Sequence, residues 1–142
     1  MSGFTGNYSC DTLRLGLANG TINFATDTFY LALYTNTATL NAQTAAYTTT
    51  GEATGGDYVA GGKVVAATVS SGTNSAGQNV TYVNFASPVW AGAITARGAL
   101  IYTPCDNGAV CVLDFGSDKT SVVSFTVQMP DNTASAALIR LV

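Results

Sequence analysis

The chain has 142 residues, a length typical of one domain, and a net charge of only −3 from five basic and eight acidic residues. The basic residues are scattered, which excludes the clustered Lys and Arg of a nucleic-acid surface or a polybasic membrane patch. Charged residues make up 9% of the chain, whereas an ordinary soluble domain has about 25%. Such a surface repels other protein weakly, so it is suited to lying against a partner.

The first nine residues predict an extended arm in which Phe4 and Tyr8 stand among small polar residues. Aromatic side chains dominate interface energetics, so we expect the arm to become ordered against a neighbouring copy or a partner protein. The alternative is that Phe4 packs on the chain's own core. The segment has neither the basic flank nor the apolar run of a signal peptide, which favours synthesis in a bacterial cytoplasm, where thiols stay reduced.

The next segment, residues 10–20, is the one convincing helix. Leu13 and Leu17 share one of its faces, and Gly20 suits its C-terminal end. The rest of the chain has strand-like patterns at hairpin-like spacing, without helical crossovers; these strands are 28–34, 63–70, 79–85, 94–103, 109–115, 121–129 and 137–142. The sequence therefore predicts an all-β fold, an antiparallel β-sandwich or jelly roll with one short N-terminal helix, forming a single domain over residues 1–142.

A long Thr-, Ala- and Gly-rich stretch, residues 35–62, separates the first two of these strands. It exceeds the loop length that compact domains usually leave unstructured, which predicts a functional or partner-packed excursion. It carries Tyr47 and Tyr58. With Phe4 and Tyr8 of the arm and Trp90 at a Pro-Val-Trp corner, these tyrosines form the aromatic set that we expect at an interface.

Catalytic residue patterns are missing from the sequence. There is no histidine, which removes the side chain that titrates near neutrality and most hydrolase triads. The acidic residues fall mostly at turns, and the three cysteines are one ligand short of a structural zinc site. We therefore expect no catalytic, cofactor-binding or metal-binding residues, and the chain is not expected to be an enzyme.

Cys105 and Cys111 flank an Asn-Gly turn, which is a strong hairpin signal. An antiparallel hairpin there would bring the two cysteines opposite each other. A cross-strand disulfide would then form in an oxidising medium, but we expect two free thiols that pack as small apolar groups.

Strand alternation places Arg97 on the same face as Ala99 and Ile101, which we expect to be the buried face. An unpaired buried charge is very costly, so an inward arginine requires a carboxylate or a set of carbonyl groups. Asp114, on the neighbouring hairpin strand, is the predicted partner. We favour a structural Arg97–Asp114 pair over a ligand-binding arginine.

Four stretches, together with the predicted helix at 10–20 and the intervening Tyr47, resemble a family of small tailed-phage virion proteins. The stretches are DTFYLALYT at 27–35, YVAGG at 58–62, ARGALIY at 96–102 and LDFGSDK at 113–119. Members are described as head decoration (cement) proteins, tail-fibre-like proteins or unassigned virion components. The resemblance implies a non-enzymatic virion protein that is assembled in the bacterial host cytoplasm and binds the major capsid protein and copies of itself, with neither nucleic acid nor membrane as a partner. Its alternative is a tail component that contacts tail proteins or a host-surface glycan, with Tyr47, Tyr58 or Trp90 on the sugar.

Overall fold

The computed structural model describes residues 4–142, so residues 1–3 of the predicted arm lie outside the described residues. The elements of the described chain are β1 (Tyr8–Ser9), α1 (Asp11–Asn19), β2 (Tyr30–Tyr34), β3 (Lys63–Val64), β4 (Ala67–Thr73), β5 (Asn79–Phe85), β6 (Val89–Ala91), β7 (Thr95–Tyr102), β8 (Ala109–Thr120), β9 (Ser124–Thr126) and β10 (Ile139–Leu141). The predicted helix is confirmed, and Gly20 ends it in the left-handed conformation.

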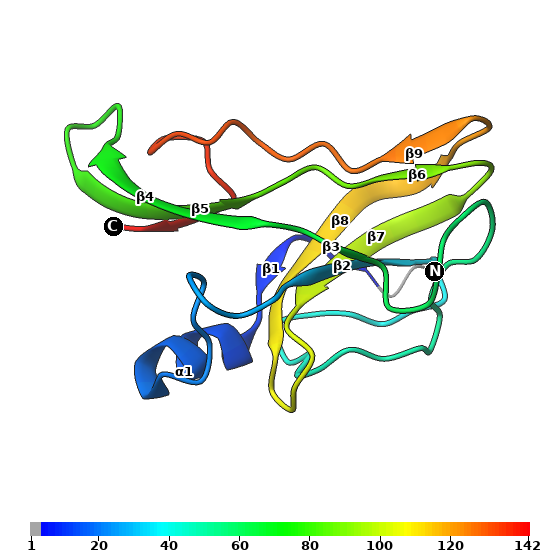
Figure 1. Ribbon diagram of the computed structural model, residues 1–142, viewed down its shortest axis with the longest axis horizontal. Coiled ribbons are helices and arrows are strands. Elements are labelled where there is room, and N and C mark those ends of the chain that lie inside the picture. The colour runs from blue at the N-terminus through cyan, green and yellow to red at the C-terminus, as the bar shows by residue number, and fades with distance from the viewer. Residues whose placement is uncertain (1–3) are drawn as a thin grey trace.

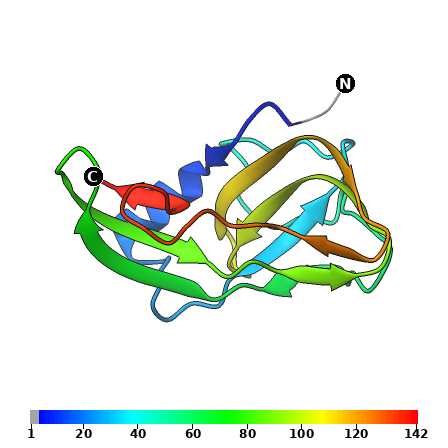
Figure 2. The same cartoon turned by 90° about the horizontal axis from the view of Figure 1, so that it is seen from above.

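The strands form three sheets in which all pairs of the described strands are antiparallel. The largest sheet has the order β1-β8-β7-β2-β3, a second has the order β10-β5-β4, and β6 pairs with β9. The two smaller sheets lie along one face of the five-stranded sheet (Figures 1 and 2). The predicted all-β, antiparallel character with one short helix is thereby confirmed.

The main core lies between these layers. Phe24, Phe29 and Phe85 meet there with ring centroids 5.2 to 6.1 Å apart. Leu31 of β2 and Ile101 of β7 point into the same core and are fully buried. Because successive side chains of a strand point to opposite faces, their neighbours Ala32 and Leu100 point out of the far face of the sheet.

That far face is also buried, and this corrects the expectation for residues 35–62. A second apolar cluster includes Ala32, Tyr34 and Leu100 of the sheet, and Ala38 and Leu40 of the long segment cover them. Figure 1 shows the segment in cyan and green-blue beneath the five-stranded sheet. An apolar sheet face must be covered, and this chain covers it with its own loop instead of a partner.

The N-terminal arm follows the alternative that Phe4 packs on its own core. Phe4 is only 4% exposed and belongs to the second cluster, and β1 pairs with β8. Gly98 lies directly under the ring, where any Cβ atom would collide with it. The expectation that the arm of residues 1–9 becomes ordered only against a partner is therefore not met for residues 4–9, because Gly98 on β7 makes room for Phe4 within the fold.

Cys105 and Cys111 are not opposite each other, although the hairpin signal predicted that they would be. Cys111 is opposite Ile101, and the register then shifts, so that Tyr102 is opposite Ala109 and Cys105 lies in the connecting loop. All three thiols are free; Cys10 and Cys111 are buried, whereas Cys105 is exposed. Burial, together with the neighbouring Asp11 carboxylate, raises the pKa of the Cys10 thiol to about 11, and burial also raises that of Cys111.

Thiol labelling of the native protein is therefore expected to modify Cys105 alone, since the reactive species is the accessible thiolate. Titration with a chromogenic disulfide near pH 8 should release one equivalent quickly, and denaturation should release two more. Cys105→Ser is the control and should abolish the fast phase. A fast phase of two equivalents, or a total of one, would contradict this arrangement.

Candidate functional site

Glu52 organises the most extensive polar network on the long segment. Its carboxylate accepts hydrogen bonds from the hydroxyls of Tyr47 and Tyr58, both at 2.6 Å, and from the backbone N–H of Gly61 at 2.8 Å. The Tyr58 hydroxyl in turn accepts the N–H of Leu33 on β2 at 2.9 Å. One carboxylate therefore ties three points of the segment to each other and to the sheet.

Aromatic stacking strengthens the same region. The ring of Tyr102 lies between Tyr30 and Tyr47, with centroid distances of 5.7 and 4.9 Å. Its hydroxyl donates to the Gly61 carbonyl at 2.7 Å. The three rings stack face to face, so stacking and hydrogen bonds within the chain hold this region together.

The tyrosines of this region are poor candidates for acid-base chemistry. Burial raises the pKa of Tyr102 to about 12, and the nearby Glu52 carboxylate acts in the same direction. Burial and the hydrogen bond to Glu52 raise the pKa of both Tyr47 and Tyr58, and burial raises that of Tyr34. Hydroxyls that hold their protons so firmly act as hydrogen-bond donors near neutral pH, so the network fastens the loop.

The aromatic residues expected at an interface do not gather on one exposed surface: Phe4 and Trp90 are buried, and the three tyrosines are half-buried. Trp90 is 1% exposed and lies in the main core, with the Tyr58 ring 5.5 Å away and the Lys63 ammonium 5.6 Å from its ring centre. Tyr47 and Tyr58 are half-buried and turn their hydroxyls to Glu52. The Pro-Val-Trp corner at residues 88–90 predicted an exposed Trp90 side chain, but β6 pairs with β9 and the indole ring points into the core.

The predicted ion pair between Arg97 and Asp114 is present, and each side chain is 13% exposed. Its predicted location is wrong, since Arg97 lies over the ring of Phe4, 5.9 Å from its centre, on the far face of the sheet. The cause is an irregularity in the β7–β8 ladder between Ala96 and Gly98. A bulge of this kind resets the alternation, so Arg97 does not share the face of Ala99.

An open groove of about 650 Å³ lies at one end of the molecule, between β1, α1 and β10. Its apolar lining includes Leu13, Leu17, Leu113, Leu138 and Ile139, and its polar lining includes Arg14 and Arg140. Of the five aromatic residues expected at an interface, only Tyr8 lines this groove.

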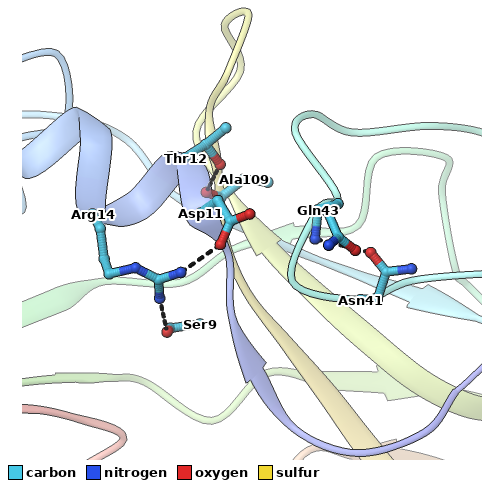
Figure 3. A network of polar contacts seen from close by, with 7 residues as sticks. All are labelled: Ser9, Asp11, Thr12, Arg14, Asn41, Gln43 and Ala109. Atoms are coloured by element: carbon cyan, nitrogen blue, oxygen red, sulfur yellow. Dashed lines mark hydrogen bonds and ion pairs between the residues drawn. The ribbon is translucent and has the colours of Figure 1, made fainter.

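The start of α1 fixes one wall of the groove (Figure 3). The Arg14 guanidinium forms an ion pair with Asp11 and donates to the Ser9 hydroxyl at 2.8 Å. The Thr12 hydroxyl donates to the carbonyl of Ala109 on β8 at 2.7 Å, and the Asp11 N–H donates to the Ala42 carbonyl at 2.8 Å. The helix is thereby tied to both the sheet and the long segment.

The turn between β8 and β9 exposes two consecutive apolar side chains, Val122 at 82% and Val123 at 79%. The sequence predicts a strand over 121–129, but β9 covers only Ser124–Thr126 and Val123 lies in the turn. The sequence analysis did not predict this exposed turn, whose residues Val122 and Val123 we call the valine tip, or the groove. The available signal was the pair of valines between two serines, since a turn normally carries polar residues.

Comparison with protein-family models, with curated proteins and with solved structures finds no match to this chain. Within residues 4–142, no group of three or more His, Cys, Asp or Glu side chains is placed to hold a metal ion. No helix of that part of the chain is long and apolar enough to cross a membrane.

Proposed function

We propose that this chain is a non-enzymatic structural protein of a tailed-phage virion, a capsid decoration (cement) protein that binds and stabilises the assembled head. One observation carries the proposal. The aromatic side chains and the Glu52 network bind other parts of the same chain, whereas apolar side chains remain uncovered at Val122 and Val123 and in the groove. Uncovered apolar surface beside a weakly charged exterior is typical of proteins that lie against other protein.

The sequence resemblance supports the same proposal. Cement proteins of this size often fold as β-sandwiches or jelly rolls, and we propose that the two layers here form a sandwich of that kind. Its partners would be the major capsid protein and further copies of the chain. The binding free energy of each contact would be modest, and the total over many copies would be large.

The copy number per particle tests this proposal. Quantitative mass spectrometry of virions from the virus that encodes the chain should give hundreds of copies per particle. A count of tens or fewer would favour the alternative, a tail component that meets the host surface, and absence from the particle would overturn both. Purified protein added to heads that lack it should co-sediment with them and raise their resistance to heating, whereas heads that neither bind it nor gain stability would contradict a cement role.

A further inference from the structure

We propose that two copies of this chain pair through β4, antiparallel about a twofold axis, so that the β10-β5-β4 sheets of the two copies join into one continuous sheet. Pairing of this kind is a property of the purified protein and does not depend on a virion function. Its basis is a free edge on β4, the absence of the features that normally protect such an edge, and the order of the hairpin that carries it.

β4 presents one unpaired side along its whole length. In the described chain it pairs with β5 alone, and Figure 2 shows it along the outer margin of the molecule, with β5 on its inner side. At the two ends of the ladder, the Ala86 N–H donates to the Ala66 carbonyl and the Asn74 N–H donates to the Gln78 carbonyl. Because hydrogen-bonded and non-hydrogen-bonded pairs alternate, the even-numbered residues of β4 direct their backbone groups to β5. The odd-numbered residues direct theirs outward: Ala67, Val69, Ser71 and Thr73.

This edge lacks the protection that outer strands usually have. Natural outer strands are kept short, or carry charged residues or prolines, because an exposed edge is a template for pairing with another chain. The remaining outer strands of the described sheets, β1, β3, β6, β9 and β10, have two or three residues each, and Lys63 and Arg140 add a charge to β3 and β10. β4 has seven residues and contains neither a charge nor a proline.

The absence of charge favours another copy as the partner. No charged residue occurs between Lys63 and Arg97, a stretch that includes both strands of the β4–β5 hairpin. Like charges that face each other across a strand pair are destabilising, and identical strands bring identical charges together. β4 brings none. An antiparallel pair of identical edges is also self-complementary, because the twofold axis matches each outward donor of one copy with an acceptor of the other.

The alternation fixes the register of the pair. Residues with outward backbone groups must be opposite one another, and full overlap places the twofold axis at Ser70. Val69 then lies opposite Ser71 of the second copy, and these two residues exchange two hydrogen bonds. Ser70 lies opposite its own counterpart as a non-hydrogen-bonded pair, with Cα atoms about 4.5 Å apart. The Val69 side chain, which is 48% exposed in the monomer, loses contact with water, and this burial favours the pair.

The edge is ordered before a partner arrives. The side-chain oxygen of Asn74 accepts the N–H groups of Ala76 and Gln78, at 3.0 and 2.9 Å, and so closes the turn between β4 and β5. The Ser75 N–H donates to the Ser135 hydroxyl at 2.9 Å, which ties this turn to the segment before β10. Pairing therefore loses little conformational entropy.

A single introduced cysteine tests both the pairing and its register. The background is Cys105→Ser, because Cys105 is the exposed thiol, whereas Cys10 and Cys111 are buried. In this background Ser70→Cys should form a covalent dimer under mild oxidation, since the Cα separation of the proposed pair suits a disulfide. Thr68→Cys is the matched control on the same strand and face. The proposed register separates its two copies by about 13 Å along the strands, which is too far for a disulfide.

Charges placed on the edge provide a second test. Val69→Lys with Ser71→Lys sets like charges opposite each other across the axis, and Val69→Glu with Ser71→Glu does the same with the opposite sign. Both side chains are exposed, so both variants should fold, which circular dichroism and thermal melting check. Val64→Lys is the control, because it adds a charge at another exposed valine, on β3.

Sedimentation velocity should show that the wild type and the Val64→Lys control form dimers as the concentration rises. Each of the two charged edge variants should associate at least about tenfold more weakly, because two like-charged pairs face each other. An equimolar mixture of the two variants should form one-to-one heterodimers, since opposite charges then meet across the axis.

Three results would overturn the proposal. The first is a wild type that stays monomeric up to about 1 mM. The second is a Ser70→Cys variant that forms no more covalent dimer than Thr68→Cys. The third is a pair of charged variants that associate as the wild type does, or that do not combine when mixed. None of these results depends on binding to phage heads, so β4 pairing and the proposed function fail independently.

Discussion

Replacing Glu52 by Leu is expected to destabilise the protein by about 3 kcal/mol, because it removes the acceptor of three hydrogen bonds. Each donor left without a partner costs ~1–3 kcal/mol, and solvent that reaches the half-buried Tyr47 and Tyr58 hydroxyls reduces the sum. Glu52→Gln keeps one carbonyl oxygen as an acceptor and should lose about half as much. Urea unfolding followed by fluorescence measures the difference, and a loss below about 0.5 kcal/mol for the leucine variant would contradict the role of Glu52.

The same substitution has a second expected signature at alkaline pH. The pKa values of Tyr34, Tyr47, Tyr58 and Tyr102 are raised, so the folded protein keeps protons that the unfolded chain loses above about pH 10. Their contribution to stability is therefore complete below that pH and declines as the pH rises further. Ultraviolet titration should show these tyrosines ionising late in the wild type. In Glu52→Gln, Tyr47 and Tyr58 should ionise at lower pH, because the carboxylate no longer holds their protons.

Local patterns were sufficient to predict many of the elements. Residues 79–85 alternate apolar and polar side chains, and β5 has those bounds. Leu13 and Leu17 share a helix face, and α1 places both against the main core. These features depend on neighbours within a few positions, which a single sequence displays.

Features that depend on distant parts of the chain could not be predicted in the same way. The face of Arg97 is set by an irregularity that involves two strands, and alternation along one strand does not contain that information. Phe4 is buried because Gly98, almost a hundred positions later, leaves room for its ring. The groove combines residues from both ends of the chain, from Asn7 to Val142, so it becomes visible only after folding.

A substitution that breaks the Arg97–Asp114 pair is also expected to lower stability strongly. Arg97→Met should destabilise the protein by about 3 kcal/mol, the lower end of the range for a fully buried pair, because each side chain retains 13% exposure. The loss arises because the Asp114 carboxylate, which is only 13% exposed, is left without its cation. The substitution also removes the cation from the face of the Phe4 ring. Chemical denaturation gives the free energy of unfolding directly.

A double-mutant cycle separates the pair from its surroundings. Asp114→Asn removes the charge but keeps an oxygen for the Gly116 N–H, which donates to Asp114 at 2.8 Å. The double variant should be more stable than the two single losses would give if they added, with a coupling of about 2 kcal/mol, because no unpaired charge remains. The exposed Arg14–Asp11 pair, with side chains 61% and 57% exposed, is the matched control, and Arg14→Met should change stability by less than about 1 kcal/mol. Equal losses at the two arginines, or additive losses at Arg97 and Asp114, would mean that burial does not strengthen the Arg97–Asp114 pair.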